Sequence, residues 1–189
     1  MKNLIYAVLC LVILVSHNIN AQIKPKGNKM ADKKVLIAYY SKSGNTEQIA
    51  KYIQEATGGD MFAIEPVKPY PEEYRATTEQ AKKEINEGYL PPIKSKVGNI
   101  ADYNVIFIGS PCWWATIAPP VSTFLKEHDL SKKIVIPFST HAGSGLANNA
   151  RDTAKLAPNS VVLDGKAFRG GSVSSAKEET RNWIDSLKF

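Results

Sequence analysis

The stretch Tyr39-Tyr40-Ser41-Lys42-Ser43-Gly44-Asn45-Thr46 decides the fold, because an apolar run ends there in a hydroxyl-rich turn and a helical pattern follows. The N–H groups at the start of that helix would point into the turn, where they and the helix dipole attract an anion. Ser41, Ser43 and Thr46 add hydroxyl donors, and Gly44 gives the backbone freedom for a tight wrap. The turn predicts a phosphate site, with a plain helix cap as the alternative.

The whole chain has the pattern of an α/β protein with a doubly wound parallel sheet. Five apolar runs alternate with segments of helical periodicity, which is typical of a sheet covered by helices on both faces. The expected strands are residues 35–40, 61–65, 105–109, 134–138, and 161–163 with a continuation toward Phe168. The expected helices are residues 46–56, 72–87, 119–127, 146–156 and 176–187. In such folds a ligand binds at the carboxyl ends of the strands, near the point where strand order reverses.

Two of the expected helices carry an apolar face that we expect to pack into the core. On residues 72–87 that face consists of Tyr74, Thr78, Ala81 and Ile85. On residues 176–187 it consists of Thr180, Trp183, Ile184 and Leu187.

Two further turns follow predicted strands and therefore belong to the same edge of the sheet. Residues 109–116 carry Trp113 and Trp114 where the chain leaves the sheet, and large indoles there either pack under a lid or meet a flat ligand. Residues 139–145 are small and polar, and their glycines let backbone N–H groups approach a planar acceptor edge. Together with the phosphate turn, these loops suit a mononucleotide with a flat heterocycle.

With these three loops in this order, the chain from Lys34 to Phe189 resembles the flavodoxin family. The resemblance implies a five-stranded parallel sheet in the order 2-1-3-4-5 and FMN as the cofactor. It also implies that the first loop holds the FMN phosphate and that the other two hold the ring. The implied phosphate residues are Ser41, Ser43, Gly44, Asn45 and Thr46; the first ring loop supplies Pro111, Cys112, Trp113 and Trp114; the second supplies Thr140, His141, Gly143, Ser144 and Gly145.

The sequence departs from the usual flavodoxin pattern in three features. Its net charge is +6, whereas electron-shuttling flavodoxins are usually strongly acidic, so docking onto positively charged reductases is disfavoured. The second ring loop lacks the tyrosine that often covers one flavin face, and His141 or a tryptophan is the expected substitute. Residues 66–98 are long for a crossover and resemble the added helix of a flavodoxin-like subgroup, which could roof the pocket.

Individual side chains of the ring loops have expected roles. Trp113 or Trp114 is expected to stack on the flavin, and backbone N–H groups of residues 143–145 are expected to bond its pyrimidine edge. Cys112 has a packing or a redox role, and packing is favoured because no resolving thiol accompanies it. His141 either donates to the flavin or a substrate, or caps the turn. No catalytic side chain is assigned, and no metal site is predicted because no His/Cys cluster has zinc spacing.

Two functions are the main candidates for such a protein, and a third option is a cofactor-binding module whose redox partner has been lost or replaced. The first, which we favour, is an electron carrier that docks onto a redox partner protein; the alternative is an NAD(P)H-dependent reductase of a quinone or similar small acceptor. A carrier keeps the flavin edge open, whereas an enzyme needs a pocket beside it. Scattered lysines without interleaved aromatic residues disfavour a nucleic-acid partner.

The N-terminus follows the layout of a secretory signal peptide. Lys2 precedes an apolar stretch at residues 4–15 that is too short to span a bilayer, so no stable membrane span is expected. Cleavage is predicted after Ala21, which makes the protein periplasmic or secreted. A start at Met30 would instead give a cytoplasmic protein.

The domain organisation is expected to be simple. Residues 1–21 form the leader, residues 22–33 a flexible tether, and residues 34–189 a single FMN-binding domain. After cleavage Cys112 is the one remaining cysteine, so no disulfide forms within the mature chain. The sequence leaves the oligomeric state open.

Overall fold

The structure is a computed structural model that describes residues 33–188. The predicted leader and residues 22–32 of the predicted tether lie outside the described residues. Within residues 33–188, no helix is both long enough and apolar enough to cross a membrane.

A parallel sheet forms the centre of the domain, as predicted. Its main path runs β2-β1-β3-β5-β6, which is the predicted order 2-1-3-4-5 with β5 as the fourth strand and β6 as the fifth. Off this path, β4 pairs antiparallel with β3, and β7 pairs parallel with β5. The strands are β1 (Val35–Tyr39), β2 (Asp60–Ala63), β3 (Val105–Trp113), β4 (Thr116–Ile117), β5 (Ile134–His141), β6 (Val161–Val162) and β7 (Lys166–Arg169).

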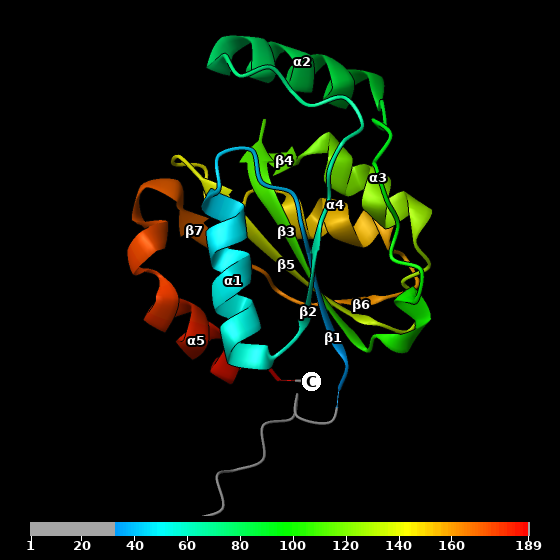
Figure 1. Cartoon of the computed structure of the whole chain (residues 1–189), viewed down its shortest axis with the longest axis vertical. Helices are drawn as coiled ribbons and strands as arrows, with labels where there is room; N and C mark the ends of the chain where they lie inside the picture. The colour runs from blue at the N-terminus through cyan, green and yellow to red at the C-terminus, as the bar shows by residue number, and fades with distance from the viewer. Residues whose placement is uncertain (1–32, 189) are drawn as a thin grey trace, which may run out of the picture.

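Helices cover both faces of the sheet (Figure 1). Helices α1 and α5 lie on one face, α3 and α4 lie on the other, and α2 stands beyond the upper end of the strands. The α-helices are α1 (Asn45–Thr57), α2 (Tyr74–Glu87), α3 (Pro119–Glu127), α4 (Asn149–Leu156) and α5 (Lys177–Ser186). Two 3-10 helices, η1 (Ile100–Asp102) and η2 (Gly170–Ser175), complete the described elements. The α/β architecture predicted from the alternating pattern is therefore confirmed.

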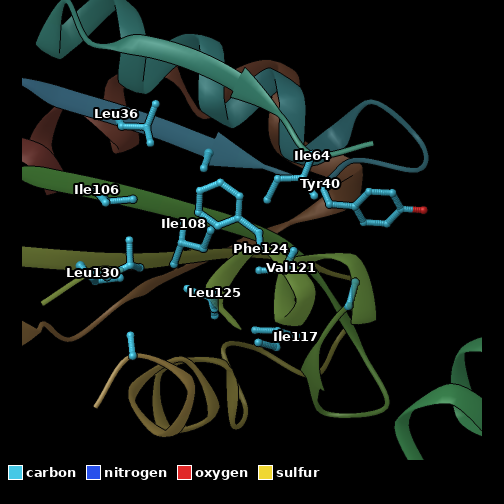
Figure 2. Close-up of a cluster of buried hydrophobic side chains, with 14 of the residues drawn as sticks. Leu36, Tyr40, Ile64, Ile106, Ile108, Ile117, Val121, Phe124, Leu125 and Leu130 are labelled. Atoms are coloured by element: carbon cyan, nitrogen blue, oxygen red, sulfur yellow. The ribbon is translucent and has the colours of Figure 1, made fainter. Parts of the chain in front are cut away.

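Two apolar clusters hold the helices to the sheet, one on each face. Because side chains alternate along a strand, Leu36 and Ile106 point to one face while Ile37 and Phe107 point to the other. Figure 2 shows the first cluster, in which side chains of β1 and β3 meet those of α3. The second cluster packs α1 and α5 against the opposite face, with Trp183 edge-on to Phe107 at 5.8 Å between ring centroids.

The predicted apolar face of α5 is confirmed, but that of α2 is only partly correct, with Thr78 and Ile85 half-buried. Ala81 is buried as expected, whereas Tyr74 is 81% exposed and its place on the buried face is taken by Thr77 and Glu84. Glu84 is buried because the Tyr70 hydroxyl and the Gln80 amide donate hydrogen bonds to its carboxylate. A prediction based on the spacing of apolar residues cannot identify a buried carboxylate of this kind.

The fifth strand of the sheet is broken where the sequence predicted one run with a continuation. Residues 163–165 separate β6 from β7, and both short strands pair with β5. Gly165 lies in the break against the strand next to it, since a Cβ there would stand 2.5 Å from the Pro137 carbonyl oxygen. Only a glycine fits at that distance.

Candidate functional site

The carboxyl ends of β1, β3 and β5 meet at one edge of the sheet, where the order of the strands reverses. Parallel register places Tyr39 beside Gly109 and Gly109 beside Phe138, so the three loops that follow emerge next to one another. The first loop is also tied directly to β3, because the Tyr40 N–H donates to the Gly109 carbonyl at 3.0 Å.

The first loop leads into α1 and leaves the N-terminal end of this helix without a side-chain cap. Gly44 stands at the N-cap with φ of 86°, a left-handed conformation that favours glycine, and no side chain caps the helix. The first helical N–H groups therefore face the loop without a side-chain acceptor. Ser41 Oγ is also buried and has no hydrogen-bond partner among the described residues. Such orphaned donors are the features that attract an anion.

Thr46 fastens this loop to the third one. Its Oγ1 lies 2.8 Å from Oγ1 of Thr140, and both side chains are buried. On the other side, Gly170 of η2 lies so close to Asn45 that a Cβ would stand 2.8 Å from the amide nitrogen. The contact brings η2 against the predicted phosphate loop.

The second loop continues β3 beyond its predicted end and returns as the short strand β4. Trp114 and Ala115 form the tight turn with φ of 51° and 63°, a conformation uncommon for residues other than glycine. Trp113 packs edge-on against Tyr40 and Tyr70, with ring centroids 5.5 and 5.0 Å away. The predicted ring loop is thus held in place by an aromatic cluster beneath it.

Trp114 connects the same loop to α2. Its indole N–H donates to the Thr78 carbonyl at 2.9 Å, and Lys82 Nζ lies 4.7 Å from the centroid of its ring. Trp114 is 53% exposed, so it is not a core residue and instead connects the loop to the helix at the surface. This location agrees with the lid that the sequence allowed for residues 66–98.

Cys112 and the start of α4 link the second loop to the third. The Asn149 side-chain amide donates to Cys112 Sγ at 3.3 Å and to the Leu146 carbonyl at 2.6 Å. The Asn148 N–H donates to the Ala115 carbonyl at 3.0 Å. Cys112 is half-buried and has a free thiol, and it makes a structural contact at this position.

The third loop begins at His141, the last residue of β5. The ring nitrogen Nδ1 of His141 is buried and has no hydrogen-bond partner among the described residues. After it come exposed small residues, Ala142, Gly143 and Ser144, and then Gly145 in a left-handed conformation with φ of 65°. This loop brings no aromatic side chain to the site other than the imidazole of His141.

Two adjoining hollows lie between these loops and α2. The larger, of about 710 Å³, is lined by most of the predicted ring-loop residues and by the inner side of α2. The smaller, of about 480 Å³, is lined by residues that include Asn45, Thr140, His141 and the start of η2. Both are bounded by Ser43, Tyr74, Pro111, Cys112, Trp113 and Ala142. The predicted residues outside both are Ser41, which borders a separate hollow beside Tyr40, together with Gly44, Thr46 and Gly145.

Several residues of the site are not among the predicted cofactor-binding residues. Tyr74 and Ala142 border both hollows, Gly170 borders the smaller one, and Lys42 is three-quarters buried beside the loops in an ion pair with Glu72 at 3.2 Å. The sequence feature that could have assigned Tyr74 to the site is its position as an aromatic residue in the first turn of an otherwise charged helix. No group of three metal-ligating side chains occurs in residues 33–188.

Two tyrosines beneath the site are held in their neutral form. Burial raises the pKa of Tyr40 well above its usual range, and the nearby Glu84 carboxylate raises it further. Burial also raises the pKa of Tyr70, with a further contribution from its hydrogen bond to Glu84. The folded protein therefore binds these two phenol protons more tightly than the unfolded chain does.

We expect this difference to make the protein less stable above about pH 10. A raised folded-state pKa contributes stability that is present below the unfolded value and is lost as pH rises beyond it, by up to about 1.4 kcal/mol per pH unit for each group. Tyr40→Phe should make the alkaline loss shallower, measured as the free energy of unfolding in urea at pH 9 and pH 11. Tyr89→Phe, at a half-exposed site, is the control; equal slopes for both variants would contradict the assignment.

The fold has counterparts among known proteins. A protein-family model described as Flavodoxin matches residues 34–187. A crystal structure from Bacteroides eggerthii DSM 20697, described as a "putative flavoprotein", shares 32% sequence identity, covers 83% of this chain and 100% of its own, and has a TM-score of 0.73.

Two further structures extend the comparison. A flavoprotein from Lactobacillus acidophilus NCFM, solved in complex with FMN, shares 27% identity, covers 77% of this chain and 99% of its own, and has a TM-score of 0.64. Oxidised flavodoxin 2 from Bacillus cereus shares 20% identity, covers 80% of this chain and 94% of its own, and has a TM-score of 0.51, a likeness of fold alone.

Proposed function

Because this chain belongs to the flavodoxin family, we propose that it binds FMN across the three strand-end loops and works as an electron carrier. The observation that carries the proposal is the convergence of an open helix end, an aromatic loop and a small-residue loop on one pair of adjoining hollows. The Lactobacillus acidophilus flavoprotein, whose structure contains FMN, supports the choice of cofactor.

The residues present fit this cofactor. Ser41 Oγ and His141 Nδ1 are buried without partners, and a buried polar atom needs a hydrogen bond that a phosphate or a flavin edge can supply. The uncapped start of α1 offers backbone N–H groups to a phosphate, and Gly44 keeps that approach clear of side-chain atoms. Ser41, Ser43, Gly44, Asn45 and Thr46 would hold the phosphate.

The ring would lie between the other two loops. Pro111, Cys112, Trp113 and Trp114 would form one wall, and Thr140, His141, Gly143, Ser144 and Gly145 the opposite one. Bound FMN supplies the redox chemistry, accepting and releasing electrons at its ring, while the protein sets the potential. The indoles favour the less electron-rich form of a neighbouring ring, and backbone N–H groups of the third loop favour added negative charge.

The net charge of the protein indicates which kind of redox partner it can dock onto. With a net charge of +6 for the full chain, or +5 once the predicted leader and its Lys2 are removed, the protein suits a redox partner that presents an acidic face, or a small acceptor, better than a basic reductase. We therefore propose an acidic docking partner for the carrier.

A second candidate function is an NAD(P)H-dependent reductase of a quinone or similar acceptor. One observation favours it: α2 forms an additional wall of the larger hollow, so that a small molecule could be enclosed beside the ring. Enclosure of this kind excludes water and positions a substrate, which an enzyme needs and a carrier does not.

The test is an anaerobic visible spectrum of the FMN-loaded protein before and after NADPH is added. For a carrier we expect the bound flavin to stay oxidised with NADPH and to be reduced by dithionite. Rapid bleaching by NADPH would overturn the carrier and support the reductase. A protein that retains no flavin after gel filtration would contradict both functions.

A further inference from the structure

We propose that Tyr74 of α2 covers the outer face of the flavin ring and so replaces the aromatic residue that is absent from the third loop. The inference rests on the proposed function and assigns one wall of the FMN site to a helix outside the three loops. The carrier and the reductase are both compatible with it.

Tyr74 is an exposed aromatic residue at a fixed position. It lies in the first turn of α2, where the Glu73 carboxylate caps the helix by accepting hydrogen bonds from the N–H groups of Arg75 and Ala76 at 2.7 and 2.6 Å. The side chain of Tyr74 is 81% exposed, and within residues 33–188 it makes no hydrogen bond and no ring contact. A large ring left uncovered on a well-anchored helix marks a contact surface.

The location of Tyr74 matches the ring site. Its side chain borders both hollows, together with Trp113 on one wall and Ala142 on another. Tyr74 is therefore one of the residues that a flat ligand bridging the two hollows would meet. Phenol rings pack well on such ligands, in offset-stacked or edge-to-face geometry.

The two indoles of the site are already engaged with other residues. Trp113 packs edge-on against Tyr40 and Tyr70, and Trp114 is fixed by its hydrogen bond to Thr78 and by the Lys82 ammonium near its ring. The third loop contributes exposed small residues at positions 142–144. Unlike the two indoles, the Tyr74 side chain is largely exposed and makes no ring contact or hydrogen bond within residues 33–188, so it is available to a flat ligand.

Helix α2 is tied to the loops that would hold the flavin. Lys42 of the first loop pairs with Glu72 at 3.2 Å, and Trp114 of the second donates to Thr78 at 2.9 Å. These contacts lie on either side of Tyr74 in the sequence, and they join the start of α2 to the first two loops. Tyr74 therefore borders the site in this structure without any rearrangement of a loop.

The first experiment measures the chemical accessibility of Tyr74 on the purified protein. Nitration by tetranitromethane, followed by peptide mass spectrometry, should modify Tyr74 rapidly without flavin and at least several-fold more slowly with saturating FMN. Tyr89 is an internal control, because it is 50% exposed, borders neither hollow and should react equally in both states. Equal protection of both tyrosines, or of neither, while FMN is bound would overturn the inference.

The second experiment uses substitution. Tyr74→Ala should weaken FMN binding about tenfold and raise the fluorescence of the bound flavin, because a stacked ring contributes affinity and quenches emission. Tyr74→Phe should keep the affinity within about twofold, and Tyr89→Ala should match the wild-type protein. If Tyr74→Ala binds FMN as tightly as Tyr89→Ala does, the inference is wrong; if the wild-type protein binds no FMN, the proposed function itself fails.

Discussion

Replacing Gly109 with alanine is expected to lower the free energy of unfolding by about 3 kcal/mol, at the upper end of the cost of overpacking a core. Gly109 lies in β3 directly beside Phe138 of β5, and a Cβ at this position would stand 2.3 Å from Phe138 Cζ and 2.6 Å from Cε2. Phe138 is fully buried, and interiors are packed closely enough that a shift of its ring would disturb the neighbouring side chains. Urea denaturation monitored by circular dichroism measures the loss.

Gly98→Ala is the matched control for this substitution. A Cβ at Gly98 would meet no atom within 4 Å, so the change should shift stability by less than about 0.5 kcal/mol. Phe138→Leu combined with Gly109→Ala should recover part of the loss, because the two side chains compete for one space. A Gly109→Ala protein as stable as Gly98→Ala would show that β3 and β5 are less tightly packed than described.

Ser43→Asp is expected to weaken FMN binding on the order of a hundredfold. Ser43 is exposed in the predicted phosphate loop, so the new carboxylate would lie near the phosphate without disturbing the core. Two unit charges 4 Å apart repel by about 4 kcal/mol at the effective dielectric constant of a protein surface, more than the roughly 2.7 kcal/mol that a hundredfold loss requires. Fluorescence titration at low ionic strength measures the dissociation constant.

Riboflavin provides a direct control because it lacks the phosphate. Its affinity should be the same for Ser43→Asp and the wild-type protein, while Ser95→Asp, an equal charge change at an exposed site away from the loops, should leave FMN affinity nearly unchanged. The effect of Ser43→Asp should also shrink as salt is added. An equal loss for riboflavin and FMN would place the damage elsewhere than at a phosphate.

The sheet could be predicted because its strands are buried on both faces. Continuous apolar runs such as residues 35–39 and 105–109 are characteristic of such strands, and the turn chemistry after them marks where they end. The three loops of the site follow from the same reasoning, since parallel strands bring their carboxyl ends together. The strand order required the family resemblance, because the alternation of elements alone is compatible with several topologies.

The elements that were missed depend on contacts between distant residues. The orientation of α2 is set by the buried hydrogen bond between Tyr70 and Glu84, which local periodicity cannot reveal. Strand β4 depends on a turn that holds Trp114 and Ala115 at positive φ, for which the sequence has no glycine signal. The approach of Gly170 to Asn45 joins segments that lie far apart in the chain.

The break between β6 and β7 also bears on self-association. Exposed edge strands are templates on which another chain can add its own strand, and long unbroken edges are therefore prone to aggregation. Here the outer edge beside β5 consists of a two-residue strand and a four-residue strand separated at Gly165, and the opposite edge is the four-residue strand β2. A sheet so rich in apolar residues is thus protected at both edges by short strands, which leave a neighbouring molecule few backbone groups to pair with.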